Sequence, residues 1–329
     1  MMSKLTNNAP NPSHWKRYSP LIRIVFSCLL LLYAFSNIDW HKIQLALPFI
    51  KPIWLLLALV LMFFCTILSG LRWALIMRRS SKNSFQDCVL WYFAGGLINQ
   101  GLPSTLGGDS YRALKAHQAS KKQPTHDANV SVSFINVALD RSLGLAGSCL
   151  LGALGLAIGG AMLGEWVPSL GWTLLLIMLL GASLISLLLY IPQTRSLYQQ
   201  LLQKIQAKQS FNPTIFAWGA PYNLIQIPVA TGIHYLNVLA FLACLEACQV
   251  RVPIEALLIA IPAMALLMIL PISISGWGIR ETSVAAILGL WDIDASLIIL
   301  ASIFYGLLTI VNYLPGTYQL MLRKNEHLS

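Results

Sequence analysis

Charge is scarce in this chain. Asp, Glu, Lys and Arg make up only 10% of its 329 residues, whereas hydrophobic residues make up 57%. An ordinary soluble domain carries about 25% charged residues, so the composition excludes a soluble globular protein. Its apolar runs are long enough for membrane-spanning helices. We therefore predict an all-α integral membrane protein.

The sequence also lacks the motifs of most cofactor and metal sites. It has no Walker loop, nucleophile elbow, HExxH pair or dinucleotide fingerprint. Its six cysteines show no CxxC spacing, so neither a disulfide framework nor a redox motif is indicated. We expect no cofactor, no bound metal and no ATP, and we do not expect an enzyme. A nucleic-acid partner is not expected either, because the basic residues are spread over several loops and ends.

The apolar segments are of two kinds. Regions 85–102 and 254–291 are broken by glycine, proline and polar residues, and we interpret them as re-entrant hairpins. The prediction is about six full transmembrane helices plus these two hairpins in one membrane domain, 21–322, between a polar tail, 1–20, and a short tail, 323–329. The candidate full crossings are 21–38, 53–77, 143–163, 171–191, 224–246 and 295–320.

The distribution of basic residues indicates the side of the membrane on which each loop lies. If 85–102 enters the membrane and returns, seventeen of the 22 Lys and Arg residues lie on one side and three on the other. Since cytoplasmic loops are rich in Lys and Arg, we expect both termini in the cytoplasm, with the protein in a bacterial inner membrane. Two hairpins entering from opposite faces suggest an inverted repeat. The alternative is a plain crossing by 254–270 followed by a tilted helix.

The segment from Gly101 to Lys115 is the first candidate site. Its glycines permit a tight turn, and Asp109 or Ser110 can cap the helix that follows. Free N–H groups at a helix start, together with Arg112 and Lys115, predict a binding site for a phosphate group. Two alternatives remain open: Asp109 and Arg112 pair with each other, or the segment is a cytoplasmic helix on anionic head groups. The candidate binding residues here are Asn99, Gly107, Gly108, Asp109, Ser110, Arg112 and Lys115.

A second turn repeats this design. Ser273, Gly276 and Gly278 precede the adjacent charges Arg280 and Glu281. Neighbouring residues on a helix point in different directions, so we expect each charge to find a partner elsewhere. Arg280 with Asp109, and Glu281 with Arg112, are the suggested pairs. The two turns would then enclose a small polar chamber.

Ionisable residues near predicted spans add further candidates. Asp140 and Arg141 stand at the head of span 143–163, where they could bind substrate or form a structural ion pair. Arg72 is expected to extend toward the cytoplasmic surface. Segment 192–212 could be an interfacial helix or a packing helix between spans.

These motifs together carry a family resemblance. The chain resembles the lysylphosphatidylglycerol synthase transmembrane-region family, also described as flippase-like membrane domains, over about residues 20–320. Asp140 is a mild departure, because that position is commonly Glu in the family. The matching landmarks are Asn99-x-x-Leu102-Pro103 with Gly107-Gly108-Asp109-x-x-Arg112, then Asp140-Arg141, then Pro271-x-Ser273-x-x-Gly276-x-Gly278-x-Arg280-Glu281.

The resemblance implies a domain that translocates lipids. Its substrates would be anionic or aminoacylated phospholipids, or lipid-linked glycans, with membrane lipids as partners. In bifunctional relatives a soluble aminoacyl-transferase domain follows, and we expect this chain to lack it, because the sequence ends shortly after the last predicted span.

We therefore predict a flippase-like transporter. Arg112 and Lys115 would hold the head-group phosphate, and Arg280 and Glu281 would form the opposing wall or gate. The alternatives are a membrane-embedded lipid-modifying enzyme and a non-transporting scaffold for a synthase or glycosyltransferase.

Overall fold

The computed structural model describes residues 14–78, 83–102, 106–121, 130–190, 220–270 and 272–326. Segment 192–212 and the two turn prolines, Pro103 and Pro271, lie outside the described residues. Every element in the described part of the chain is a helix, as predicted from the composition. The elements are α1 (His14–Ser36), α2 (Trp40–Ala46), η1 (Leu47–Phe49), α3 (Pro52–Met77), α4 (Phe85–Gly101), α5 (Leu106–Lys121), α6 (Val130–Gly159), η2 (Gly160–Leu163), α7 (Val167–Tyr190), α9 (Ala220–Ala247), α10 (Ile254–Leu267), α11 (Ile279–Leu288), η4 (Gly289–Trp291), α12 (Ala295–Tyr313) and α13 (Gly316–Glu326).

Several of these helices have the length and apolar composition of membrane spans. Four qualify on their own, and α1 with α2 and η1 forms a fifth candidate that is bent by 77°. The apolar helix α7 lies at a position where a further span was predicted. The chain is thus a multi-pass membrane protein of the predicted class. The four single spans are Pro52–Met77, Asn136–Leu163, Gln226–Ala247 and Ala295–Tyr313.

Local residues mark the starts of three helices, two by capping and one by a proline in the first turn. Ser84 accepts a hydrogen bond from the backbone N–H of Asp87 at the start of α4. Asp294 accepts one from Ser296 at the start of α12. Pro52 occupies the first turn of α3, where its missing N–H costs nothing. The chain therefore marks these boundaries locally, before any tertiary contact is made.

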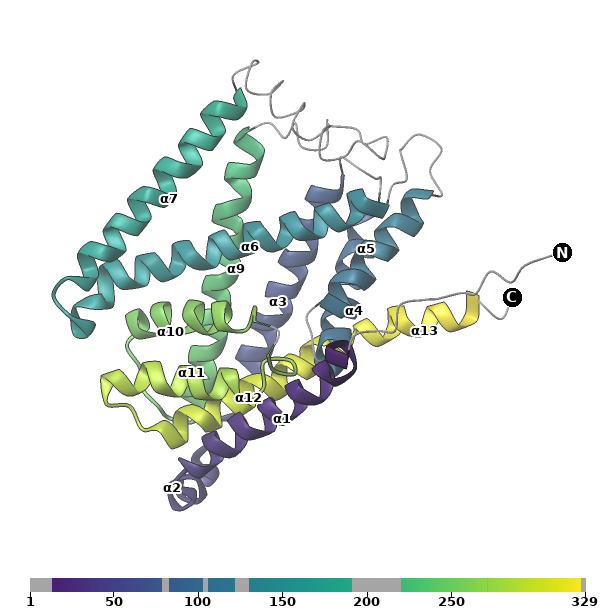
Figure 1. Ribbon diagram of the computed structural model, residues 1–329. Coiled ribbons are helices and arrows are strands. Elements are labelled where there is room, and N and C mark those ends of the chain that lie inside the picture. The colour runs from purple at the N-terminus through teal and green to yellow at the C-terminus, as the bar shows by residue number, and fades with distance from the viewer. Residues whose placement is uncertain are drawn as a thin grey trace.

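The two halves of the molecule use the same order of elements. A long helix is followed by a two-helix hairpin and a second long helix, first as α3, α4–α5 and α6, then as α9, α10–α11 and α12. The first helices of the halves, α3 and α9, pack along each other, while α10 packs on α6 and α4 packs on α12 and α13 (Figure 1). This exchange of equivalent contacts is what a repeat requires. The direction in which each hairpin enters the membrane stays a prediction.

The length of α10 bears on the choice between a hairpin and a plain crossing. Its 14 residues give a helix of about 21 Å, whereas the hydrocarbon core is about 30 Å thick. After a turn, α11 returns and packs against α10. The short helix therefore favours the hairpin over a plain crossing by 254–270.

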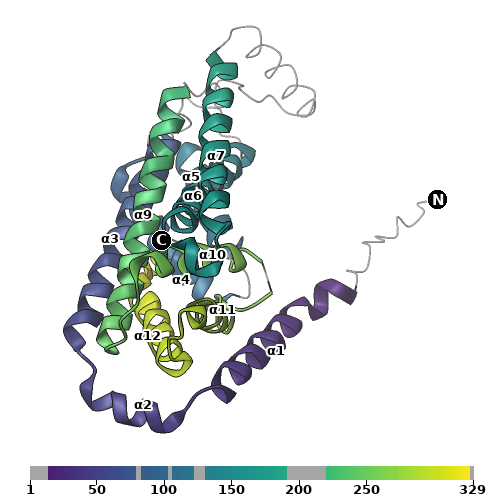
Figure 2. The ribbon, with the colours of Figure 1, turned by 90° about the vertical axis from the view of Figure 1, so that its left-hand side faces the viewer.

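Helix α1 supports the second hairpin from outside the bundle. Figure 2 shows α1 running along one side and joined through α2 to α3. Its Ser27 hydroxyl accepts a hydrogen bond of 2.8 Å from the backbone N–H of Ile274, in the turn between α10 and α11. A Cβ atom at Gly278 would lie 2.6 Å from the Cβ of Leu30. The α10–α11 turn is therefore enclosed, and its glycine permits the approach of α1.

Candidate functional site

The first predicted turn joins α4 and α5 in very close contact. The Asn99 side-chain oxygen accepts a hydrogen bond of 2.8 Å from the backbone N–H of Gly108. A Cβ atom at Gly108 would lie 2.0 Å from the carbonyl oxygen of Gly95. Glycine is thus required here for the approach of two backbones. This contact fixes the first turn of α5, which carries the charged residues of the site.

Arg112 lies on the buried face of α5. The residue is 2% exposed, and its guanidinium lies 4.3 Å from the ring centre of Tyr92 and 5.1 Å from that of Trp73. It donates to Asp109 over 2.8 Å and to Asp140 over 3.1 Å. The predicted alternative in which Asp109 and Arg112 pair with each other is confirmed. Arg112 is therefore held by two carboxylates and two aromatic faces.

Asp140 lies between two arginines. One of its carboxylate oxygens accepts from Arg112, and the other accepts from Arg72 of α3 over 2.6 Å. Arg72 also donates to the backbone carbonyl of Asp140 over 3.1 Å. Arg72 is 5% exposed, so the prediction that it extends to the cytoplasmic surface is wrong. The buried carboxylate of Asp140 holds it inside the bundle instead.

Asp109 is the second shared carboxylate. Arg141 donates to both of its oxygens, from Nε over 2.9 Å and from Nη2 over 2.8 Å. Arg141 is 48% exposed, and Asp109 is 14% exposed. Asp140 and Arg141 thus each pair with a residue of α5, and α6 begins well before them, at Val130. The predicted start of this span at 143 is therefore too late for the helix.

The resulting network joins α3, α5 and α6. It contains three arginines and two aspartates, and so carries one positive charge in excess. Lys115 adds a further cation one turn after Arg112, half-buried and without an ion pair among the described residues. Ser110 is also half-buried in the first turn of α5. This side of the molecule has the charge that an anionic group requires. The network consists of Arg72, Asp109, Arg112, Asp140 and Arg141.

The second predicted turn is built around an ion pair of its own. Arg280 donates to one oxygen of Glu281 from Nε over 2.9 Å and from Nη2 over 2.6 Å. The other oxygen of Glu281 accepts from the backbone N–H of Gly278 over 2.7 Å. The prediction that these charges find partners elsewhere, and the suggested pairs with Asp109 and Arg112, are wrong. Glu281 folds back to cap its own helix, and this brings its carboxylate beside the neighbouring guanidinium.

Glycines and an aromatic ring shape the surroundings of that pair. Gly276 and Gly278 have φ angles of 78° and 86°, which side chains rarely adopt. The Arg280 guanidinium lies 4.6 Å from the ring centre of Trp277. A Cβ atom at Gly306 of α12 would lie 2.0 Å from Arg280 Nη2. The turn thus buries a charged pair against one ring and one bare stretch of helix.

The tips of the two hairpins meet, as predicted. Ser275 donates a hydrogen bond of 2.7 Å to the side-chain oxygen of Gln100. Ser273 is buried nearby in the second turn. No ion pair joins the two charged clusters in the part of the chain that the structure describes. The hairpins therefore touch through neutral polar groups, with one charged cluster in each.

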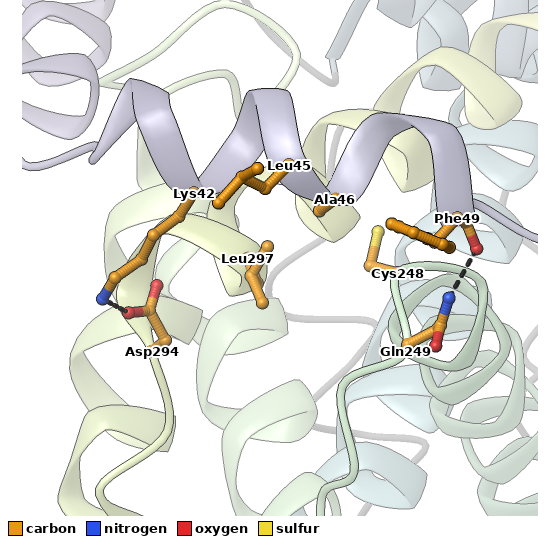
Figure 3. A pocket seen from close by; sticks show the side chains of 8 residues that line it. All are labelled: Lys42, Leu45, Ala46, Phe49, Cys248, Gln249, Asp294 and Leu297. Carbon is orange, nitrogen blue, oxygen red and sulfur yellow. Dashed lines mark hydrogen bonds and ion pairs between the residues drawn. The ribbon is translucent and has the colours of Figure 1, made fainter.

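A groove lies at a different place, beside α2. It has a volume of about 410 Å³, and Lys42 of α2 forms an ion pair across it with Asp294 of α12 (Figure 3). Gln249 closes one end by donating to the backbone carbonyl of Phe49 over 2.7 Å. Burial alone would raise the pKa of Asp294, but hydrogen bonds from Lys42 and Ser296 outweigh it and hold that pKa below its ordinary value. The lining residues are Lys42, Leu45, Ala46, Phe49, Cys248, Gln249, Asp294 and Leu297.

Sequence reasoning did not identify this groove. The only indication in the sequence is the predicted topology. It places Lys42 outside the membrane and starts the last span, 295–320, on the same side. Among the described residues, no group of three or more His, Cys, Asp and Glu residues is arranged to hold a metal ion.

Comparison with known families identifies a related family. The model of the lysylphosphatidylglycerol synthase TM region matches residues 21–316, which is nearly the whole chain. No curated protein matches the sequence. The matched range contains every charged residue of both clusters described above.

Proposed function

Because the chain belongs to the lysylphosphatidylglycerol synthase TM region family, and so to membrane proteins of lipid metabolism or transport, we propose that it translocates a lipid across the membrane as a flippase-like transporter. The substrate is an anionic or aminoacylated phospholipid, or a lipid-linked glycan. The acyl chains stay in lipid while the polar head group passes through the protein, which avoids leaving a charge in hydrocarbon.

The excess charge of the arginine network carries this proposal. Three arginines share two carboxylates, and Arg141 is half exposed at the open end of the network. A charge that is left unbalanced at membrane depth is costly, so such residues usually mark a substrate path. A phosphate group would restore the balance. It would first meet Arg141 and Lys115 and then exchange with Asp109 or Asp140 on Arg112.

Arginine suits this role because its planar fork can hold two phosphate oxygens at once. The start of α5 supplies the backbone N–H of Gly107, whereas the N–H of Gly108 is already bound to Asn99. On the other hairpin, Arg280 and Glu281 form the opposing wall or gate. Directed movement would be driven by an ion or proton gradient, with Asp109, Asp140 and Glu281 as titratable candidates.

The proposal includes the setting of the protein. We place it in a bacterial inner membrane with both termini in the cytoplasm, the side on which Lys and Arg are usually concentrated. Its proposed partner is a synthase or glycosyltransferase. No chemical step is assigned to the chain itself.

Transport can be tested in liposomes. The full chain is reconstituted with phosphatidylglycerol that carries a fluorophore on one acyl chain, and an impermeant quencher reports the lipid exposed outside. We expect Arg112→Ala to abolish exchange between leaflets and Arg112→Lys to retain part of it. The Arg112→Ala variant should still fold, because Asp140 remains paired with Arg72 and Asp109 remains paired with Arg141.

Arg78→Ala is the matched control, since Arg78 is an exposed arginine at the end of α3. Unchanged exchange by a folded Arg112→Ala protein would contradict the site. Mass spectrometry of the recovered lipid separates the alternatives: a modified lipid would indicate an enzyme, and neither exchange nor product would indicate a scaffold.

A further inference from the structure

Arg72 makes less use of its guanidinium than Arg112, the other buried arginine of the network. Only Nη2 is engaged, by the carboxylate and the backbone carbonyl of Asp140. Nε and Nη1 are buried and have no hydrogen-bond partner among the described residues. Because the Arg72 side chain is only 5% exposed, water does not readily replace the missing hydrogen-bond partner. A buried N–H group without an acceptor is destabilising, and a charged one more so.

The surroundings of Arg72 are formed by α3, α6 and α9. Four residues after Arg72, Ile76 of α3 packs with Leu143 of α6 and against Ile227 of α9. Gly144 of α6 leaves a bare stretch of helix, so that a Cβ atom there would lie 3.6 Å from Arg72 Nη2. The Arg72 side chain, which belongs to α3, thus lies near α6, and the three helices α3, α6 and α9 pack on one another.

Helix α9 brings two further polar groups to this region. His234 lies beside the backbone of Gly144 and within electrostatic range of Arg72. Gln226, which precedes Ile227, is 2% exposed, and its side-chain oxygen has no partner among the described residues. The region is polar although helices enclose it, which is unusual for packing alone in a membrane.

The second half of the molecule has no equivalent excess. There, one arginine and one glutamate balance each other, and Glu281 is also satisfied by Gly278 and approached by Ser302 over 3.4 Å. The unbalanced charge and the unused donors therefore occur in the first half alone among the described residues. A purely structural network would not need this difference between two similar hairpins.

We propose that Arg72 forms a second anion position, separated from Arg112 by the carboxylate of Asp140. Nε and Nη1 bind a phosphate group there, with His234 of α9 at its edge. One oxygen of Asp140 holds Arg72 and the other holds Arg112, so the aspartate couples two successive positions of one head group. This inference rests on the proposed function only in taking a phosphate-bearing lipid as the source of the anion.

Binding in detergent tests the position without requiring transport. The probes are inorganic phosphate and dioctanoyl phosphatidylglycerol, with dioctanoylglycerol as the phosphate-free comparison. Asp140→Asn should bind the phosphate probes more tightly than the wild type, because Arg72 and Arg112 each lose a competing carboxylate. Adding Arg72→Gln to that variant should then weaken binding about tenfold or more, as expected for loss of a charged hydrogen bond.

The matched control is Arg78→Gln in the same Asp140→Asn background, which should bind like Asp140→Asn alone. If Arg72 only neutralises Asp140, removing it after Asp140 has lost its charge changes nothing. Equal affinity of the Arg72→Gln/Asp140→Asn protein and the Asp140→Asn protein for both phosphate probes would therefore overturn the proposal. Weaker binding of both probes indicates a position for phosphate itself, and weaker binding of the lipid alone indicates one for the complete head group.

Folding is checked by the melting temperature of each variant. Should the glutamine variant melt too early to be assayed, Arg72→Lys in the same background is used instead. Lysine keeps the charge but loses the fork, so we expect weaker yet measurable binding, and undiminished affinity would count against the proposal. A protein that binds through Arg72 but moves no lipid would retain this site while contradicting the transport function.

Discussion

Ser275 donates a hydrogen bond to Gln100 over 2.7 Å, and so joins two turns that are 175 residues apart in the chain. Ser275 has a φ of 51°, a left-handed conformation that is uncommon for a residue with a side chain. Gln100 is at the end of α4, one residue before Gly101 closes the helix. The strained serine and the terminal glutamine therefore place the tips of the two hairpins in contact.

This contact predicts a specific cross-link. Gln100→Cys with Ser275→Cys should be joined by a short thiol-reactive cross-linker, because the two side chains are within hydrogen-bond distance. The exposed Cys28 is first replaced by serine. The linked peptides are identified by mass spectrometry after digestion.

The control pair is Gln100→Cys with Ser169→Cys. Ser169 is in the first turn of α7, which begins across the bundle from α4 (Figure 1). The same reagent should not join the two thiols of this control pair. Equal yields for the two pairs would mean that the hairpin tips do not meet in the membrane.

The features that the sequence predicts correctly are mostly local. The turn of the second hairpin follows from an apolar run that is interrupted by glycine and polar residues, and the Asp109–Arg112 pair follows from a spacing of three residues on a helix. Region 85–102 is instead one unbroken helix, α4, which forms a hairpin only together with α5. The contact between the hairpins was predicted from their similar design. Each of these depends on residues that are close in the chain or repeated in it.

The features that were missed depend on tertiary packing. The contact of Arg72 with Asp140 spans 68 residues and two helices, and nothing in the spacing identifies it. The sequence argues against a pairing of Arg280 with Glu281, because neighbouring residues on a helix point in different directions. That argument neglected the length of both side chains and the N–H of Gly278, which draws Glu281 back.

The buried pair in the second hairpin predicts a large effect on stability. Glu281→Ala leaves Arg280, which is 3% exposed, without a carboxylate and removes the cap of α11. Breaking a buried ion pair on one side usually costs about 3–5 kcal/mol. The melting temperature in detergent should fall markedly, while Glu165→Ala, at an exposed glutamate, should leave it within error.

A double variant separates charge from packing. Arg280→Met with Glu281→Leu removes both charges together, and an apolar replacement of a buried pair is often neutral. We expect it to recover part of the stability that Glu281→Ala loses. A double variant that melts below Glu281→Ala would show that Arg280 stabilises the turn through its contacts with Trp277 and Gly306 even without its carboxylate partner.

The close approach of α4 and α5 predicts intolerance to a single methyl group. Gly108→Ala places its Cβ 2.0 Å from the carbonyl oxygen of Gly95, which must shift. The Gly95 oxygen is a backbone atom and the new Cβ is bonded directly to the backbone, so neither can turn aside as a flexible side chain would. The hairpin would therefore have to open, and Asp109 and Arg112 would move with α5. We expect a lower yield of folded protein and loss of lipid exchange.

Gly101→Ala is the control for this substitution. A Cβ atom there meets nothing within 4 Å, and alanine favours helix over glycine by up to about 1 kcal/mol. It should fold as well as the wild type or slightly better. Comparable yields for Gly108→Ala and Gly101→Ala would contradict the packing of the hairpin.

The ion pair between Lys42 and Asp294 predicts a pH-dependent contribution to stability. Hydrogen bonds from Lys42 and Ser296 hold the pKa of Asp294 below its ordinary value in the folded protein. A carboxyl group of this kind contributes stability above its unfolded pKa of about 3.9, and loses it as the pH falls through the lower folded pKa. Because both side chains are partly exposed, the contribution should be only about 0.2–1 kcal/mol.

The measurement is the difference in melting temperature between the wild type and Asp294→Asn from pH 7 to pH 3. Above about pH 5 the wild type should melt slightly higher, and the difference should shrink as the pH falls below about 4. Asp292→Asn, at an exposed aspartate two residues earlier, lacks the Lys42 contact and should show no such change. A difference for Asp294→Asn that grows toward low pH would reverse the expected sign, and would mean that α2 is not held to α12 by this charge.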